Sequence, residues 1–512
     1  MTPFLQFRVW LRRGPSGEHV LAAIAAVLAL ALGAWTLVPA DEDDGSTNVA
    51  ADSGISSTVA SESSGGAGTA EGPQPGTADS GTPAGAAGTS AGGEAGEPVL
   101  AEAATGTATT PSPDGCAGLR SNDQGISPSE IFVAVPLLNL GGDVGNETFG
   151  IRADLEAVAN ATAAGVNSEG GVACRKLRIK TYRVNPLDQN EQRSKCLQIA
   201  GDKPFAVIDF ASYLDPVDRA CFIENKLPYE GATSITEEEA SGGAPYMYSV
   251  LSSTDRQLRN WVFETAARGG FDRTKGFRKL GVIQNSCAPK VNDELERNLG
   301  KVGVSEDALS TFTISCSSVA PPNEISSAVL QHRRDNASHV LLAVAVANSQ
   351  SYVRNADGLG WKPVYMASDY GSVTNSSPAK DWQAGFDGTI GITSQRGGEL
   401  NAGIVAPQVA RCQEWMKKAN VRPPTAEGDA ALAMCDMFRL FVAAANGAGP
   451  GLVRTSLLDG LSKVGRFESA GFGDGLYDRR GKVTGGDFIR SIQWRVDCKC
   501  WKLVDRDTKP GH

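Results

Sequence analysis

The stretch that decides the fold runs from residue 131 to residue 182 and reads IFVAVPLLNLGGDVGNETFGIRADLEAVANATAAGVNSEGGVACRKLRIKTY. It begins with the apolar run Phe132–Val135, which predicts a buried strand. A glycine-rich turn follows at 141–145, then a helical pattern over about Phe149–Asn167 and a second strand over Leu177–Tyr182. The stretch therefore predicts a β–α–β unit, in which two parallel strands are joined by a crossover helix.

The same alternation of strand and helix continues along the chain. A helix is expected over Asn190–Ala200, and further strands over Phe205–Ile208, Leu280–Ile283, Thr311–Ile314, Val340–Val346 and Pro363–Met366. Strands separated by single helices indicate parallel sheets with right-handed crossovers. These units are too many for one typical sheet, so two doubly wound α/β lobes are predicted, with any ligand at the carboxyl ends of the strands. Near the C-terminus, Phe488–Val496 alternates like a strand and Cys498–Trp501 is expected to continue it.

Charge is distributed unevenly along the 512 residues, whose formal net charge is −10. Residues 41–115 hold twelve acidic and no basic side chains, and residues 1–40 have a net charge of +2, which leaves residues 116–512 with no net charge. A neutral body without a lysine or arginine run excludes an electrostatic surface for nucleic acid.

The N-terminal segment contains an uncharged, apolar run at residues 20–40, preceded by three arginines and followed by four acids. Twenty such residues in a helix span about 30 Å, the thickness of a bilayer core. The charge bias places residues 1–19 in the cytoplasm as a basic tip and the rest outside the cell membrane as a single-pass protein. The alternative is a cleaved signal peptide ending near Val38-Pro39-Ala40, which would give a secreted protein.

Residues 41–115 form a spacer in which 56 of 75 residues are Gly, Ala, Ser, Thr or Pro. Such a segment buries too little apolar area to offset its ordering entropy, so we expect a disordered linker. Random-coil scaling gives an end-to-end distance of roughly 50 Å.

Several motifs of the body, in the same order, resemble the type I periplasmic binding proteins, and most closely the leucine/isoleucine/valine-binding branch of ABC transporter substrate-binding proteins. The most specific is Ala164–Asn167 with Gly170–Val172 and Arg175–Leu177. The others are Ile131–Pro136 with Gly141–Asp143, Lys226–Pro228 with Gly231–Thr233, Ala356 with Gly358–Pro363, and Tyr477-Asp478 with Arg480-Gly481. The resemblance covers about residues 130–506.

The resemblance implies two lobes joined by a hinge of three chain crossings. We place the crossings near Val250–Ser252, Thr393–Arg396 and Phe472–Tyr477. The first lobe is then 116–251 with 396–474, and the second is 252–395 with 475–506.

The resemblance also implies a ligand site for an amino acid. In that family a serine, a threonine and backbone amides hold the ligand carboxylate, and these positions fall on Ser212, Thr233 and Gly231. The family's acid for the ligand ammonium falls on Asp369. Hydroxyl and amide donors suit a carboxylate, and a carboxylate suits an ammonium.

This sequence departs from the family at two ligand-covering positions. Where the family has aromatic residues, this chain has Ala345 and Val144, which puts branched-chain specificity in doubt and enlarges the expected pocket. The alternatives are that Ser212 and Thr233 simply cap helices and that Asp369 is a solvated loop acid.

All ten cysteines lie in the body, which indicates disulfides in an exported domain. Three pairs are plausible: Cys287 with Cys316, whose strand ends are expected to be adjacent, then Cys174 with Cys196, then Cys412 with Cys435. Cys116 and Cys221 stay unassigned. For Cys498 and Cys500, the alternative to disulfide pairing is a site that binds a metal or exchanges thiols.

The predicted function is a non-enzymatic receptor that captures an amino acid or similar small polar ligand and delivers it to an ABC transporter. The alternative is a membrane-tethered sensor or scaffold with the same fold. An enzyme is disfavoured because no metal, nucleotide or serine-nucleophile motif has a suitable context, and His332 and His339 are expected at the surface. No cofactor, metal or nucleic-acid partner is predicted.

Overall fold

The computed structural model describes residues 116, 118–140, 152–186, 188–211, 216–316, 319–425 and 428–512. The predicted basic tip 1–19, apolar span 20–40 and linker 41–115 lie outside these residues, as do the candidate site residues Val144 and Ser212. The described chain forms two lobes, each built on a mixed arrangement of helices around a largely parallel sheet.

The first lobe has a five-stranded parallel sheet in the order β2-β1-β3-β4-β5. Its strands are β1 Glu130–Leu138, β2 Lys176–Val184, β3 Ala206–Asp209, β4 Tyr229–Gly231 and β5 Met247–Tyr248. The connecting helices are α4 Leu155–Ser168, α5 Gln189–Gly201, α6 Pro216–Glu224 and α7 Glu237–Gly242. The first predicted β–α–β unit is thus confirmed, with β1 and β2 paired in register over their full lengths.

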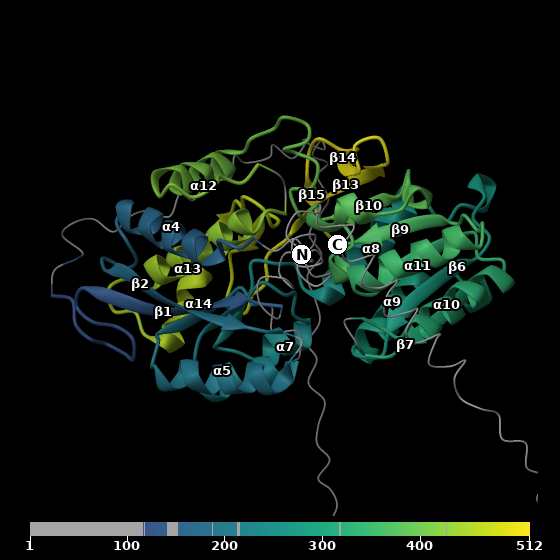
Figure 1. Ribbon diagram of the computed structural model, residues 1–512. Coiled ribbons are helices and arrows are strands. Elements are labelled where there is room, and N and C mark those ends of the chain that lie inside the picture. The colour runs from purple at the N-terminus through teal and green to yellow at the C-terminus, as the bar shows by residue number, and fades with distance from the viewer. Residues whose placement is uncertain are drawn as a thin grey trace, which may run out of the picture. The chain divides into compact units, whose positions relative to one another are not determined.

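A later part of the chain returns to complete this lobe. It contributes α12 Pro407–Lys418, α13 Ala430–Ala448, α14 Leu457–Leu461 and the small antiparallel pair β11 Gly465–Phe467 and β12 Gly475–Tyr477. Figure 1 shows these yellow-green helices gathered with the blue elements α4, β1 and β2. The lobe therefore combines segments more than 200 residues apart in sequence.

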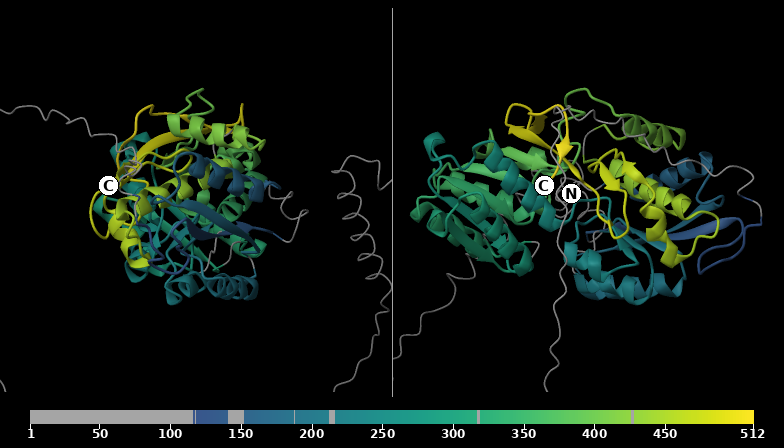
Figure 2. Two further views of the ribbon diagram at one scale, coloured as in Figure 1. Left: turned by 90° about the vertical axis from the view of Figure 1, so that its left-hand side faces the viewer. Right: turned by 180° about the vertical axis from the view of Figure 1, so that it is seen from behind.

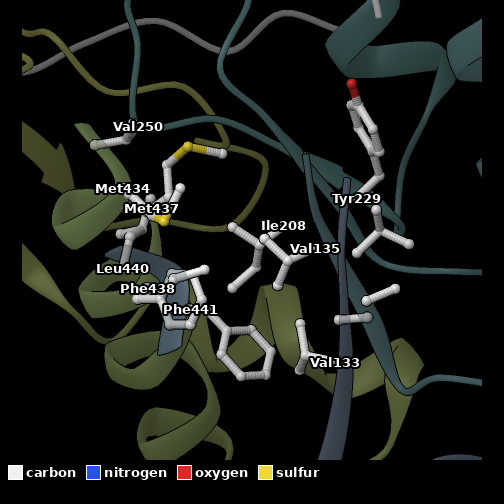
Figure 3. Packing of buried hydrophobic residues seen from close by; sticks show 14 of the residues in the cluster. Val133, Val135, Ile208, Tyr229, Val250, Met434, Met437, Phe438, Leu440 and Phe441 are labelled. Atoms are coloured by element: carbon white, nitrogen blue, oxygen red, sulfur yellow. The ribbon is translucent and has the colours of Figure 1, made fainter. Parts of the chain in front are cut away.

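The core of the first lobe lies between its sheet and α13. Val133 of β1 and Ile208 of β3 lie beside Phe438 and Phe441 of α13 (Figure 3), and all four side chains are fully buried. Burying one such side chain stabilises a fold by about 1.5–3 kcal/mol. Helix α13 is also the one described helix long and apolar enough to cross a membrane, but most of it is buried in this core.

The sequence motif that best matched the family has a structural role in this lobe. Asn167 at the end of α4 donates to the Leu177 carbonyl (2.9 Å) and accepts from the Leu177 N–H (2.7 Å), which fixes the start of β2. Gly171 has a left-handed φ of 76°, and an added Cβ would lie 2.1 Å from the carbonyl oxygen of Arg175. The buried Arg175 guanidinium donates to four backbone carbonyls. The motif therefore builds the turn between α4 and β2.

The second lobe contains an eight-stranded sheet. Five parallel strands, in the order β7-β6-β8-β9-β10, are followed by antiparallel β13 and β14, and β15 pairs with β13. Their bounds are β6 Leu280–Asn285, β7 Leu309–Ile314, β8 His339–Ala343, β9 Val364–Ser368, β10 Ile390–Thr393, β13 Phe488–Arg495, β14 Cys500–Leu503 and β15 Lys509–Pro510. The helices are α8 Thr254–Ala267, α9 Pro289–Lys301, α10 Pro322–Arg334 and α11 Val346–Gly358.

One expected strand is wrong in this lobe. Cys498–Trp501 does not continue β13, because the chain turns at 496–499 and returns as the antiparallel strand β14, with Trp494 opposite Trp501. Seen from behind (Figure 2, right), the yellow β13–β14 hairpin lies with the green strands of the second lobe. The hairpin buries both tryptophans completely, which a single continued strand at the sheet edge would not.

The ten cysteines form five disulfides. Cys287 pairs with Cys316 and Cys412 with Cys435, as expected. The expected pair of Cys174 with Cys196 is wrong, since Cys174 pairs with Cys116 and Cys196 with Cys221. The reason is that Cys196 faces α6 from α5, whereas Cys174 lies in the turn before β2. Cys498 and Cys500 pair with each other, so they are not free for a metal.

Candidate functional site

The chain passes between the two sheets three times. The first crossing follows β5, the second follows β10, and the third lies between β12 and β13. The third crossing was expected near Phe472–Tyr477, but it lies later in the chain. Val483 still belongs to the core of the first lobe, and Ile489 is the next residue that belongs to the core of the second lobe. Residues 475–483 therefore belong with the first lobe rather than the second.

Glycines allow the three crossings to lie against one another. A Cβ on Gly485 would lie 2.2 Å from the Val250 carbonyl oxygen of the first crossing. A Cβ on Gly486 would lie 2.9 Å from the Ser394 hydroxyl oxygen of the second crossing. The first and third crossings are also hydrogen bonded, since the Gly485 N–H donates to the Ser249 carbonyl (3.0 Å). We call residues 249–253, 394–396 and 484–487 the hinge.

Half-buried ion pairs link the hinge to both lobes. The Arg256 guanidinium of α8 pairs with Asp487 and donates to the Thr484 hydroxyl (2.9 Å) and the Gly485 carbonyl (2.6 Å). Asp487 also accepts from the Lys482 ammonium (3.0 Å) and the Leu476 N–H (2.7 Å). Burial, with the Arg256 charge beside it, lowers the pKa of Lys482 to about 8. The hinge is therefore held by one carboxylate shared between an arginine and a lysine.

A second ion-pair group lies at the second crossing. The Arg396 guanidinium pairs with Asp474 (2.9 Å) and Glu399 (3.1 Å), and the neighbouring carboxylates raise its pKa above the ordinary arginine value despite burial. Glu399 also pairs with Arg490 of β13. This group joins the returning segment of the first lobe to the second sheet.

On the first lobe, Gly231 ends β4 and is buried. A Cβ there would lie 2.8 Å from the hydroxyl oxygen of Tyr229, which donates to the fully buried Asp209 carboxylate at the end of β3 (2.6 Å). The same carboxylate accepts from the Ala211 N–H (2.8 Å), so it fixes the backbone that leads into the unplaced Ser212. Sequence reasoning missed Asp209, although an acid at the end of a predicted strand was visible.

Thr233 lies two residues beyond β4 and is half-buried. It is not the residue that caps α7: that role belongs to Thr236, whose hydroxyl accepts from the Glu239 N–H (3.0 Å) in a capping box. The neighbouring Ser234 hydroxyl accepts from Gln257 of α8 (2.6 Å), which places this loop beside the hinge. Thr233 therefore occupies the end of a parallel strand, next to a crossing.

On the second lobe, Asp369 follows β9 and is buried, not solvated. Its carboxylate accepts from the Thr374 hydroxyl, the Thr393 hydroxyl (2.5 Å), the Ser394 N–H (2.7 Å) and the Ser394 hydroxyl (2.7 Å). An ionised carboxylate has about four acceptor positions. The hydrogen-bonding capacity of Asp369 is thus occupied by the chain itself, and two of its donors come from the second crossing.

Ala345 lies beside the Asp369 segment. It precedes α11, and a Cβ on Gly371 would lie 2.2 Å from the Val344 carbonyl oxygen and 3.0 Å from the Ala345 Cα. The structure therefore brings the segments that follow β8 and β9 together. It also adds two residues that sequence reasoning missed: Tyr370 is buried, and its hydroxyl accepts from the Asn285 amide at the end of β6 (3.3 Å).

His332 and His339, which were expected at the surface, are both buried. The fully buried His332 of α10 shares a 2.7 Å hydrogen bond with the Tyr352 hydroxyl, and burial lowers its pKa to about 4. His339 is buried in β8, and burial lowers its pKa as well. Within the described residues no group of three or more His, Cys, Asp or Glu side chains is arranged to hold a metal ion.

Comparison with family models and with curated proteins gives no match for this sequence. Solved structures do match. A substrate-binding protein of an ABC transporter from Desulfitobacterium hafniense in complex with leucine is 13% identical, with a TM-score of 0.53 over 73% of this chain and 100% of that one. A fatty acid ABC transporter substrate-binding protein from Thermomonospora curvata is 14% identical, with a TM-score of 0.56 over 78% and 96%.

A third structure is a solute-binding protein of an ABC transporter from Rhodopseudomonas palustris BisB5 in complex with 3,4-dihydroxybenzoic acid. It is 13% identical, with a TM-score of 0.54 over 75% of this chain and 98% of that one. The described residues therefore have the fold of the type I periplasmic binding proteins, and the two-lobed α/β fold predicted for the body is confirmed. The predicted transmembrane helix and linker lie outside the described residues.

Proposed function

We propose that this protein is an extracytoplasmic, non-enzymatic receptor that binds a small carboxylate solute between its two lobes and delivers it to an ABC transporter. The observation that carries the proposal is the hinge: three crossings lie against one another through glycine and connect two largely parallel sheets. In such folds ligands bind at the carboxyl ends of the strands, and a hinge lets the lobes close on them.

Chemistry that the compared proteins share supports the proposed ligand class. The three solved structures named above are described with leucine, fatty acid and 3,4-dihydroxybenzoic acid, which have a carboxylate in common. In this chain the residues at the end of β4, Gly231 and Thr233, offer a backbone N–H and a hydroxyl as donors. We assign the carboxylate of the ligand to them, together with Ser212.

The second lobe decides whether the ligand also carries an ammonium. The four hydrogen bonds already made to Asp369 leave no acceptor position for an ammonium in this arrangement. An amino acid would therefore have to displace the Thr374 or Thr393 hydroxyl. An acid without an amine would leave the Asp369 hydrogen bonds intact, and the small Ala345 beside them leaves room for an apolar body.

Thermal shift on the full-length chain tests the proposal. The panel contains leucine, octanoate, 3,4-dihydroxybenzoate, a sugar and a polyamine. Stabilisation by at least one carboxylate and by neither the sugar nor the polyamine is expected. If no carboxylate raises the unfolding temperature, the receptor proposal as stated is wrong.

Variants of the two lobes then test the site. Thr233→Ala should weaken binding of the active carboxylate about 10-fold, because a hydrogen bond to a charged group contributes about 1.5–3 kcal/mol. Asp369→Ala should weaken binding by roughly 10- to 100-fold only if the ligand carries an ammonium. The matched controls are exposed Ser241→Ala and Asp293→Asn, which should leave affinity unchanged.

The location is part of the proposal. Five disulfides that involve all ten cysteines fit an oxidising compartment outside the cytoplasm. We propose that residues 20–40 anchor the chain in the membrane and that 41–115 connect the anchor to the lobes. Protease treatment of intact cells should remove the folded lobes, whereas a cytoplasmic protein would be protected.

A further inference from the structure

The β13–β14 hairpin carries a disulfide whose two cysteines are separated by a single residue. Cys498 lies in the turn at 496–499, and Cys500 begins β14, opposite Arg495 of β13. The proposed solute-binding function makes no use of this bond. The hairpin is an edge of the second sheet, so its tip extends beyond the sheet's hydrogen-bonded ladder.

The Cys498–Cys500 disulfide is more exposed to solvent than most of the other disulfides. The four cysteines of the pairs Cys196–Cys221 and Cys412–Cys435 are buried, whereas Cys498 is exposed and Cys500 half-buried. Thiol–disulfide exchange requires a thiolate to reach a sulfur atom, so the buried pairs are protected from it. Of the remaining pairs, Cys116–Cys174 is half-buried at both cysteines and Cys287–Cys316 is exposed at both.

The two exposed disulfides differ in what they hold together. Cys287 and Cys316 are 29 residues apart and join the segments after the neighbouring strands β6 and β7. Cys498 and Cys500 are 2 residues apart. The entropic stabilisation from a disulfide grows with the length of chain it closes, so the Cys498–Cys500 bond contributes little of this kind.

The hairpin keeps its structure from other contacts. Trp494 and Trp501 face each other across the strands and are fully buried beneath the tip, and the Trp494 indole N–H donates to the Ala379 carbonyl (2.9 Å). Breaking the disulfide therefore leaves the hairpin's anchoring in place. It also releases Lys499, which the short ring holds in the left-handed region with φ of 49°, an unfavourable conformation for a residue with a side chain.

The charges around the tip favour a thiolate. Arg495, Lys499 and Lys502 are its cations, and Asp497 is its acid. Asp497 pairs with Lys502 (2.8 Å), and Arg495 lies 3.5 Å from Asp387. Lys499, which lies between the two cysteines in sequence, is exposed. A neighbouring cation lowers the pKa of a thiol and so makes it a better leaving group in exchange.

We propose that Cys498 and Cys500 form a surface site for thiol–disulfide exchange with a dithiol. A thiolate of the dithiol attacks one sulfur of the pair, which forms a mixed disulfide and releases the other cysteine as a thiolate. The second thiol of the partner, as its thiolate, then attacks the mixed disulfide. The partner leaves as a disulfide, Cys498 and Cys500 are reduced by two electrons, and the two protons of the dithiol end on the two cysteines.

Reduction of the full-length protein tests the proposal, with Cys287–Cys316 as the control within the same molecule. The protein is exposed to limiting dithiothreitol, newly formed thiols are alkylated at intervals, and each cysteine is quantified by mass spectrometry. Cys498 and Cys500 should be reduced at least 10-fold faster than Cys287 and Cys316, with no loss of circular dichroism. Equal or slower reduction would overturn the proposal.

A catalytic assay gives a second readout. The wild-type chain should accelerate oxidation of a dithiol peptide by oxidised glutathione, and the double variant Cys498→Ser/Cys500→Ser should lose at least 90% of that acceleration. The matched double variant Cys287→Ser/Cys316→Ser should retain it. Absence of acceleration in the wild type, or its survival in Cys498→Ser/Cys500→Ser, would also reject the exchange site.

Discussion

The carboxylate of Asp369, which follows β9, accepts a hydrogen bond of 2.7 Å from the backbone N–H of Ser394, which follows β10. Ser394 also contacts the third crossing, because a Cβ on Gly486 would lie 2.9 Å from its hydroxyl oxygen. The acid that the sequence assigned to the ligand is thus bonded directly to a chain crossing. A ligand that draws on Asp369 would change the hydrogen bonds of the hinge at the same time.

Asp369 should contribute strongly to stability whatever the ligand is. Asp369→Ala removes the acceptor for four donor groups on two segments and leaves buried donors unsatisfied, each at a cost of about 1–3 kcal/mol. We expect a loss of about 3 kcal/mol in the free energy of unfolding, measured by urea denaturation. Asp293→Asn on the exposed face of α9 is the control. A loss below about 0.5 kcal/mol for Asp369→Ala would mean that its hydrogen bonds are not maintained in solution.

Gly485→Ala should force the first and third crossings apart. The new methyl group would lie 2.2 Å from the Val250 carbonyl oxygen, a contact that only a backbone shift can relieve. We expect about 1–3 kcal/mol of destabilisation, typical of overpacking, together with weaker binding of the solute. Gly300→Ala in α9, where an added Cβ meets no atom within 4 Å, is the matched control and should not destabilise the protein. The same loss in both variants would contradict the close packing of the hinge.

Asp487→Asn should loosen the shared ion pair of the hinge. The change leaves the half-buried Arg256 and Lys482 without a compensating charge. Breaking a fully buried pair from one side costs about 3–5 kcal/mol, so a smaller loss is expected here. Hydrogen exchange followed by mass spectrometry should show faster exchange in 249–253 and 484–487 than in the strands of either sheet. The exposed pair Lys418–Glu414 provides the control, because Glu414→Gln should leave exchange in the hinge unchanged.

His332 should make the protein acid-sensitive. Its folded pKa of about 4 lies below the ordinary histidine value of 6.5, so the folded state favours the neutral ring. The stabilisation is fully present above pH 6.5 and is lost as the pH falls through about 4, a change of about 3 kcal/mol. His332→Gln, which cannot be protonated, should remove this part of the pH dependence in urea titrations between pH 7 and pH 4. An unchanged pH dependence would place its origin elsewhere.

Glu230 should have the opposite effect on the pH dependence of stability, because it favours the folded state at low pH. It is fully buried in β4, and burial raises its pKa well above the ordinary glutamate value. The folded state therefore favours the protonated form, so its contribution is present below pH 4.5 and declines as the pH rises. Glu230→Gln keeps the shape without the charge and should raise the unfolding temperature at pH 8 more than at pH 5. Equal effects at both pH values would contradict a protonated Glu230.

Much of the fold was predictable because it depends on local patterns. The alternation of buried strands and helices identified the first β–α–β unit and both doubly wound lobes, since each strand in a parallel sheet reads as an apolar run. Gly231, Thr233 and Asp369 were assigned from the family resemblance, and the structure places them at the end of β4 and in the segments after β4 and β9. Asp209, Tyr370 and the Arg256–Asp487 pair were not predicted, because nothing in their neighbourhood in sequence indicates their partners.

The sequence by itself determined that this protein is a two-lobed α/β body with neutral charge, because composition and periodicity are properties of the chain. Only the tertiary structure decided which cysteine pairs with which, that 488–503 turns back as a hairpin, and that Asp369 is bonded to the hinge. The physical reason is distance along the chain. Cys116 pairs with Cys174 across 58 residues, and Arg256 meets Asp487 across 231, so these contacts form only when the lobes have folded.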